Sequence, residues 1–139
     1  MAGYSETPLV KKLGIKSGFN IAVLNAPANF SLDFDLPSEV TINSRSAKPL
    51  DFALLFVTSE QDLRKRFSQY AAKLKPAGMV WVAWPKKSSG VATDLSFTKV
   101  QAIGLAAGLV DTKICAVNEV WSGLKFVFRL KDRPKSQRP

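Results

Sequence analysis

The chain has 139 residues, of which 46% are hydrophobic, and this is the size of one ordinary domain whose core needs no covalent staples. It has no histidine and a single cysteine, Cys115, so we predict no metal site, no internal disulfide and no histidine-based catalysis. Of the formal net charge of +9, residues 129–139 contribute +4 through five cations and Asp132. We therefore predict one domain over residues 1–130 and a basic, disordered tail over residues 131–139.

The sequence also bears on location. It contains no run of the roughly 18 apolar residues needed to span a membrane, and its polar, acidic start lacks the features of a signal peptide. We expect a cytoplasmic protein with no membrane partner, and the oligomeric state stays open. Cys115 lies in an alternating segment, Lys113–Val117, which favours a buried and unreactive thiol.

The first predicted element is a short helix over Thr7–Ile15. Thr7 suits the N-cap, Pro8 suits the first helical position and Gly14 suits a left-handed stop. After a turn, the mostly apolar segment Phe19–Leu24 predicts a buried first strand.

The next stretch predicts one weak strand and one strong strand. A turn into a helix is expected at Asn25–Pro27. The pattern is then weak as far as Pro49, with a possible short strand at Glu39–Ile42. Leu50–Val57 is a continuous apolar run of strand length, which predicts an interior strand.

A helix is predicted after Ser59, which suits its N-cap. Its first turn is acidic and its last turn, at Lys73 and Lys75, is basic, the order that the helix dipole favours. Pro76 and Gly78 are expected to stop it before the next strand. Its apolar stripe has spacings of three and four, typical of a helix packed on a core: Leu63, Phe67, Tyr70, Ala71 and Leu74.

Met79–Trp84 is apolar on both faces, which is typical of a central strand in a sheet covered on both sides. The polar loop Pro85–Asp94 follows it and leads into a second helix that begins near Ser96. Two further strands, Leu109–Val117 and Gly123–Leu130, are joined by so short a link that they should form an antiparallel pair.

This order of elements predicts an α/β fold, specifically a small Rossmann-like three-layer domain with a mostly parallel sheet and a C-terminal antiparallel strand. It resembles the second half of a class I S-adenosylmethionine-dependent methyltransferase. Leu50–Val57 is similar to the fourth strand of that fold, Leu74–Trp84 to the start and body of the fifth, and Leu109–Leu130 to the closing hairpin.

A more specific resemblance covers Tyr4 to about Arg129. Its segments are YSETPL at 4–9, LGIK at 13–16, LFVT at 55–58, WPKKSSGVATD at 84–94 and VNEVWSGLK at 117–125. On these segments the chain is similar to a bacterial domain-of-unknown-function family, number three-zero-five-two. That resemblance implies a bacterial source and no particular activity.

The loop after the first strand departs from the methyltransferase pattern. In that pattern a glycine-rich turn lets the backbone approach the cofactor, and an acidic residue after the second strand binds the ribose hydroxyls. Asn25–Asn29 has no glycine, and Thr41–Ser44 has no carboxylate. The sequence therefore predicts no cofactor.

The polar loop offers ammonium, hydroxyl and backbone donors just before a helix. The candidate ligand-binding residues are Lys86, Lys87, Ser88, Ser89, Gly90 and Thr93. Such donors can bind a small anionic ligand or phosphate, although their order is not that of a P-loop. The alternative is a solvated loop whose hydroxyl and carboxylate groups only cap the helix.

A second group of candidate contacts lies between the last two strands. There, Asn118, Glu119, Trp121 and Ser122 place a carboxylate beside an indole, which suits a ligand contact or a weak general base. The alternative is that the tryptophan covers the end of the sheet.

The two polar loops should lie at one edge of the sheet. Leu109–Val117 follows a crossover helix and should return either parallel to Met79–Trp84 or as an outer partner of the last strand, and a parallel return brings its C-terminal end to the side of Trp84. We predict a shared cleft with Lys86 or Lys87 near Glu119. The walls of this cleft are expected to be Trp84 and Trp121, which would form an apolar pocket.

Three functions stay open. The first is a small-anion binding or interaction module without catalysis, because histidine, a reactive thiolate and paired carboxylates are missing. The alternative is a degenerate methyltransferase-like enzyme that has rebuilt its cofactor site. The third is weak nucleic-acid binding through Arg64–Arg66 and the tail, although such a charge run is more often a solvated helix face.

Overall fold

A computed structural model describes residues 8–28, 30, 36–42 and 49–130 of the protein, so the predictions for Thr7 and for residues 131–139 lie outside it. None of the described helices is long and apolar enough to cross a membrane. The elements are α1 (Leu9–Leu13), β1 (Asn20–Leu24), β2 (Thr41–Ile42), β3 (Leu50–Phe56), α2 (Glu60–Ala71), β4 (Leu74–Pro85), a short 3-10 helix (Lys87–Ser89), α3 (Phe97–Ala106), β5 (Leu109–Ala116) and β6 (Trp121–Phe128).

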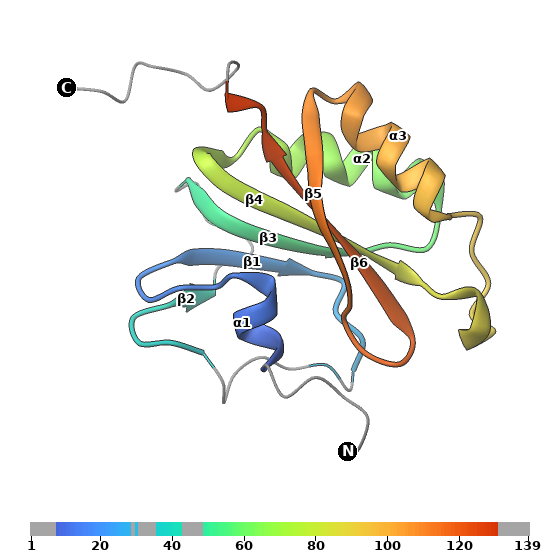
Figure 1. Cartoon of the computed structure of the whole chain (residues 1–139), viewed down its shortest axis with the longest axis horizontal. Coiled ribbons are helices and arrows are strands. Elements are labelled where there is room, and N and C mark those ends of the chain that lie inside the picture. Colours follow the sequence, from blue (N-terminus) through green and yellow to red (C-terminus); the bar gives the residue numbers. More distant parts are fainter. Residues whose placement is uncertain (1–7, 29, 31–35, 43–48, 131–139) are drawn as a thin grey trace.

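Six strands form one sheet in the order β2-β1-β3-β4-β6-β5 (Figure 1). The first four strands are parallel, whereas β6 runs antiparallel to both β4 and β5. The predicted α/β fold and the predicted antiparallel last pair are therefore confirmed. Because β6 lies between β4 and β5, β5 runs in the same direction as β4 and forms an edge of the sheet.

Helices cover both faces of the sheet and make three layers, with α1 on one face and α2 and α3 on the other (Figure 1). The core under α2 and α3 includes the fully buried Leu63 and Phe67. The core under α1 includes Leu13, Phe52 and Trp81. The buried indole N–H of Trp81 donates to the Leu13 carbonyl at 2.9 Å, which attaches α1 to the central strand.

The N-terminal elements differ in detail from the prediction. Pro8 occupies the N-cap position of α1 and makes no side-chain hydrogen bond there, whereas Gly14 is left-handed as expected, with φ of 87°. Residues 25–28 after β1 contain no helix, and most of the positions that follow them lie outside the described residues, so the expected turn into a helix stays a prediction. Strand β2 keeps only two of the residues predicted for it.

Helix α2 is shorter than predicted. The Ser59 hydroxyl accepts the capping hydrogen bond as expected, but the helix ends at Ala71 and has no basic last turn. Lys73 follows the helix and Lys75 already belongs to β4, where its ammonium group lies 3.1 Å from the Asp51 carboxylate. An ion pair with the neighbouring strand thus replaces the expected interaction with the helix dipole.

The prediction that Pro76 and Gly78 precede the central strand is also wrong, since both lie inside β4. The pairing of β4 with β3 changes register after Leu50, and this irregularity accommodates a proline that cannot donate to a regular ladder. Gly78 is required there because a Cβ atom would lie 2.9 Å from the Leu50 carbonyl oxygen.

Candidate functional site

The polar loop after β4 and the β5–β6 connection meet at the carboxyl edge of the parallel strands, as predicted. Pro85 at the end of β4 pairs with Trp121 at the start of β6. Just beyond this pair, the backbone N–H of Lys86 donates to the Val120 carbonyl at 2.8 Å. The two segments are therefore physically joined.

The two tryptophans, however, do not enclose a common space. The register places Ser122 opposite Trp84 and Trp121 opposite Pro85, and successive strand residues point to opposite faces. Trp84 packs in the core under α2 and α3, whereas Trp121 packs on the α1 face against Phe56, with ring centroids 5.1 Å apart. The predicted shared apolar pocket is wrong because the sheet separates its two walls.

The first half of the polar loop is held by its own hydrogen bonds. The Ser89 hydroxyl donates to the Lys86 carbonyl at 2.6 Å and accepts from the Val91 N–H at 3.1 Å. Gly90 follows in the left-handed conformation, with φ of 78°. Ser89 and Gly90 thus shape the turn.

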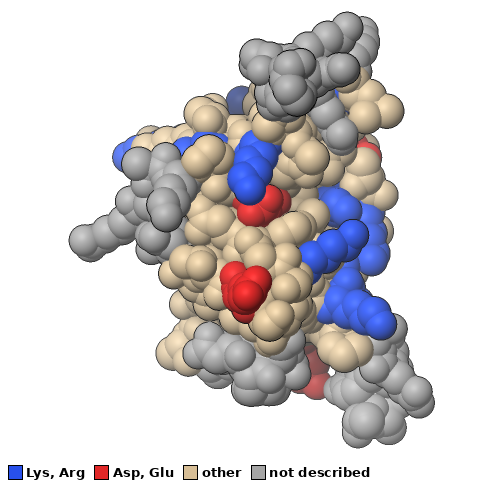
Figure 2. Space-filling model, turned by 90° about the vertical axis from the view of Figure 1, so that its left-hand side faces the viewer, with Lys and Arg blue, Asp and Glu red and all other residues tan. Residues whose placement is uncertain are grey.

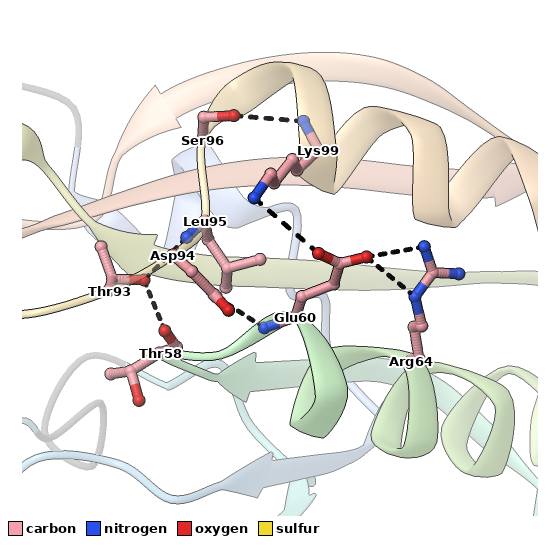
Figure 3. Close-up of polar contacts among 8 residues, drawn as sticks. All are labelled: Thr58, Glu60, Arg64, Thr93, Asp94, Leu95, Ser96 and Lys99. Carbon is pink, nitrogen blue, oxygen red and sulfur yellow. Dashed lines mark hydrogen bonds and ion pairs between the residues drawn. The ribbon is translucent and has the colours of Figure 1, made fainter.

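The second half of the polar loop is attached to the start of α2 (Figure 3). The Thr93 hydroxyl donates to the Thr58 carbonyl at 2.5 Å and accepts from the Leu95 N–H at 3.1 Å. The Asp94 carboxylate accepts from the Glu60 N–H at 2.8 Å, so it caps α2 from a distant segment. These contacts agree with the capping alternative for Thr93.

Charged side chains extend this network across both helices (Figure 3). The Glu60 carboxylate lies 2.8 Å from the Arg64 guanidinium and 3.8 Å from the Lys99 ammonium group. Ser96 caps α3 by accepting from the backbone N–H of Lys99 at 3.3 Å. The N-termini of both helices at this edge are therefore capped by side chains of the protein itself.

Three residues of the predicted anion site keep uncommitted side chains. Lys86, Lys87 and Ser88 make no side-chain hydrogen bond or ion pair with any residue that the structure describes. Lys87 and Ser88 are exposed, and Lys86 is half-buried. These three are the part of the loop available to a ligand.

The β5–β6 connection is a self-bonded turn. The Asn118 side-chain oxygen accepts from the N–H groups of Val120 and Trp121 at 2.9 and 3.0 Å. Glu119 is exposed within this turn. Trp121 is half-buried against the sheet, as the covering alternative expects.

The charge run on α2 is largely paired. Arg64 pairs with Glu60, and the Arg66 guanidinium lies 3.3 Å from the Asp62 carboxylate. Lys65 is exposed between them. This arrangement matches a solvated helix face.

A different location follows from the strand order. The chain passes from β1 outward to β2 and then back to β3 on the other side, so the direction of winding reverses between β1 and β3. Ligands of open α/β sheets bind outside the carboxyl ends of strands at such a switch point. At this point Asn25, directly after β1, has a left-handed backbone with φ of 60°.

The loop after β1 fits an approaching ligand in its backbone. Asn25 takes the conformation that glycine usually supplies, and asparagine is among the residues that tolerate it best. The N–H groups of Ala26 and Ala28 donate to no described backbone carbonyl, whereas Pro27 has no N–H. A ribose-binding carboxylate of the usual kind is missing, because residues 41–48 contain no acid.

Cavities lined by described residues include three that lie away from this edge. One of about 560 Å³ is mostly apolar and lies at the amino edge of the parallel strands, lined in part by Leu74, Leu109 and Phe128. Another, of about 410 Å³, lies beside α1, and a third, of about 170 Å³, lies between α2 and α3.

Several solved structures with the same arrangement are methyltransferases. The chain is similar to a SAM dependent methyltransferase from Aquifex aeolicus, with a TM-score of 0.62 and 15% identity over 85% of this chain and 86% of that one. It is similar to magnesium protoporphyrin IX methyltransferase from Synechocystis PCC 6803, with a TM-score of 0.57 and 8% identity over 87% of this chain and 74% of that one.

A third similar structure is the fibrillarin pre-rRNA processing protein of Methanococcus jannaschii, with a TM-score of 0.55 and 12% identity over 91% of this chain and 70% of that one. These likenesses show a Rossmann-like methyltransferase fold. No family model and no curated protein matches the chain, so the resemblance to the bacterial family three-zero-five-two stays a prediction.

Proposed function

We propose that the protein is a reduced methyltransferase-like enzyme that binds S-adenosylmethionine at the switch point between β1 and β3. The observation that carries this proposal is the left-handed Asn25 directly after β1, since it supplies a glycine-like turn where a glycine-rich loop is otherwise needed. The missing ribose carboxylate means that the sugar would be held in a different way from the usual one.

The fold favours this function over the anion-binding module that the sequence put first. Two of the similar structures are methyltransferases of which the chain covers 86% and 74% of the length. The polar loop, by contrast, uses Ser89, Thr93 and Asp94 to fasten itself and to cap α2.

The chemistry is compatible with a chain that has no histidine. S-adenosylmethionine supplies a methyl group on a sulfonium centre, and its transfer depends on alignment of donor and acceptor. Residues 25–28 would hold the ligand on one side. The ring centroid of Phe56 lies 4.9 Å from that of Phe30 and 5.1 Å from that of Trp121. These three aromatic side chains would exclude water on the α1 side.

Calorimetry and thermal unfolding with S-adenosylmethionine and S-adenosylhomocysteine test this proposal. At a ligand concentration about a hundred times the dissociation constant, we expect a stabilisation of about 2.7 kcal/mol. Ala26→Arg, at an exposed position of the loop, should weaken binding at least ~10-fold by filling the approach to the switch point, which is ~1.4 kcal/mol.

The matched control is Ala102→Arg, because Ala102 is also exposed but lies on α3. This variant should bind like the wild type. Absence of heat and of stabilisation with either ligand would refute the proposal. Equal weakening in both variants would place the binding site elsewhere.

A small-anion site at Lys86, Lys87 and Ser88 is the second candidate, because these side chains are uncommitted beside the β5–β6 turn. Inorganic phosphate should then raise the melting temperature of the wild type. Lys86→Gln with Lys87→Gln should abolish this rise without changing the response to S-adenosylmethionine.

A further inference from the structure

Two lysines face each other on the last pair of strands. Lys113 of β5 lies directly opposite Lys125 of β6 in the antiparallel ladder. Lys125 in turn pairs with Trp81 of β4, which lies in the core under α1, so both lysines belong to the α1 face of the sheet. Like charges directly opposite each other destabilise a sheet.

The end of α1 adds further cations to this place. The Lys113 ammonium group donates to the Lys12 carbonyl at 3.0 Å, which brings β5 against the last turn of α1. The charges of Lys16 and Lys113 both act on Lys125, and those of Lys12 and Lys113 both act on Cys115. We call Lys12, Lys16, Lys113 and Lys125 the lysine patch.

The lysine patch lacks compensating charge among the described residues. Every ion pair formed within the described part of the chain involves other cations, namely Arg64, Arg66, Lys75 and Lys99. Burial lowers the pKa of Lys125, and the charges of Lys113 and Lys16 lower it further. Figure 2 shows basic side chains gathered along the right-hand border of its view.

Protection of the sheet edge explains only part of this arrangement. A lysine on an edge strand discourages pairing with another chain, and Lys113 suits that role on β5. Lys125 lies on β6, which has neighbours on both sides, and so it protects no edge. The opposition of the exposed Lys113 and the half-buried Lys125 calls for an external anion.

We propose that the lysine patch binds the phosphodiester backbone of a single-stranded nucleic acid without reading its sequence. Three of its cations come from α1, β5 and β6, and the fourth, Lys16, follows α1. Lys16 lines the cavity of about 410 Å³ beside α1, whereas neither Lys113 nor Lys125 lines any of the three cavities. A strand with one phosphate per nucleotide matches such a spread of charge better than one small anion does. This surface differs from the Arg64–Arg66 face, whose arginines are paired.

Fluorescence anisotropy with labelled oligouridine, measured between about 50 and 200 mM KCl, tests the proposal. Lys113→Gln with Lys125→Gln should weaken binding ~10-fold at the lower salt concentration. It should also reduce the slope of log affinity against log salt by about 1.4, since each phosphate contact contributes roughly 0.7 for single strands. An oligothymidine of the same length should bind in the same way.

The matched control is Lys65→Gln with Lys73→Gln, which removes the same charge from exposed positions of α2 and the segment after it. This variant should retain affinity within about twofold at equal salt. The double variant of Lys113 and Lys125 loses the exposed hydrogen bond from Lys113 to the Lys12 carbonyl, but it also loses the like-charge contact, so its melting temperature should stay close to that of the wild type. Weaker binding would then not reflect unfolding.

Three results would overturn the proposal. The first is no binding of either oligonucleotide by the wild type at low salt, and the second is equal weakening in both double variants. The third is tighter binding of polyglutamate than of oligouridine with the same dependence on Lys113 and Lys125, which would assign the patch to an acidic protein.

Discussion

Charge is handled differently at the carboxyl edge of the sheet and on the α1 face of the last two strands. At the carboxyl edge, Asp94 caps α2 and Glu60 contacts both Arg64 and Lys99, so each of these charges has a partner (Figure 3). On the α1 face, Lys113 and Lys125 lie opposite each other without a described counter-ion.

This difference shows that a concentration of polar residues in the sequence is only a partial guide to unsatisfied charge, because in one loop Asp94 caps a helix whereas Lys86 and Lys87 have no described ion pair. The loop at Lys86–Asp94 attracts notice because it is rich in donors, yet much of it serves to join β4 to α2. The lysines of β5 and β6 look ordinary in the sequence. They become unusual only because the register of the ladder opposes them.

The largest expected effect comes from Gly104→Ala, which tests how firmly α3 holds β6, the strand that both regions share. A Cβ atom on Gly104 would lie 2.0 Å from the ring of Phe126, so either the helix or the ring must move. We expect a loss of about 3 kcal/mol in the free energy of unfolding, measured with urea.

The control is Phe126→Leu, made alone and together with Gly104→Ala, because the smaller side chain leaves room for the added methyl group. The double variant should therefore lose less than the sum of the two single variants. Additive losses would mean that the contact with Phe126 is not the cause.

Removal of the cap that Asp94 provides for α2 tests the carboxyl edge of the sheet. Asp94→Ala leaves the N–H of Glu60 without its acceptor and should cost about 1 kcal/mol in urea unfolding. Glu60→Gln, which weakens only the exposed ion pairs with Arg64 and Lys99, should cost less than about 0.5 kcal/mol. A larger loss for Glu60→Gln than for Asp94→Ala would contradict the role assigned to the cap.

Lys125→Met tests the lysine patch and should raise the free energy of unfolding by a few tenths of a kcal/mol at neutral pH. The pKa of Lys125 is lowered in the folded state, so in the alkaline window between this lowered value and the usual one the unfolded chain binds more protons. In the wild type, the destabilisation of the folded state by the charge of Lys125 is thus fully present at neutral pH, and it is relieved as the pH rises through that window.

The advantage of Lys125→Met should accordingly shrink with rising pH in urea unfolding series. Lys65→Met is the control, because Lys65 is an exposed residue of α2 away from the patch. An advantage for Lys125→Met that is constant through the alkaline range would show that lost repulsion is not its source.

The smallest expected effect is on the reactivity of Cys115, which lies within the field of the patch. Burial raises the pKa of its thiol, while Lys12 and Lys113 oppose that rise. Alkylation by iodoacetamide at mildly alkaline pH should therefore be slower than for a free thiol, and Lys113→Gln should slow it by a further factor of about two. Faster alkylation in Lys113→Gln would contradict the electrostatic coupling.

Several elements could be predicted because their signals are local. The apolar runs at β3 and β4 and the capping residue Ser59 specify strands and a helix start from neighbouring residues alone. The end of α2 could not be predicted in this way. Leu74 continues a helical stripe, but pairing with Leu50 places it in β4, and this contact joins residues 24 positions apart.

The candidate site shows the same limit. The meeting of the two polar loops follows from strand direction, which the order of elements implies. The face on which each side chain lies does not follow, because a shift of one residue in register reverses it. Trp84 and Trp121 were placed at the correct edge and yet lie on opposite sides of the sheet.

The sequence by itself thus determined the alternation of strands and helices, the methyltransferase-like order and the antiparallel ending, because hydrophobic period and link length act over a few residues. Only the tertiary structure decided that Asn25 is left-handed at the switch point, that Asp94 caps α2 and that Lys113 opposes Lys125. These features depend on register and packing between segments distant in the chain, and such contacts leave no periodic signal in the sequence.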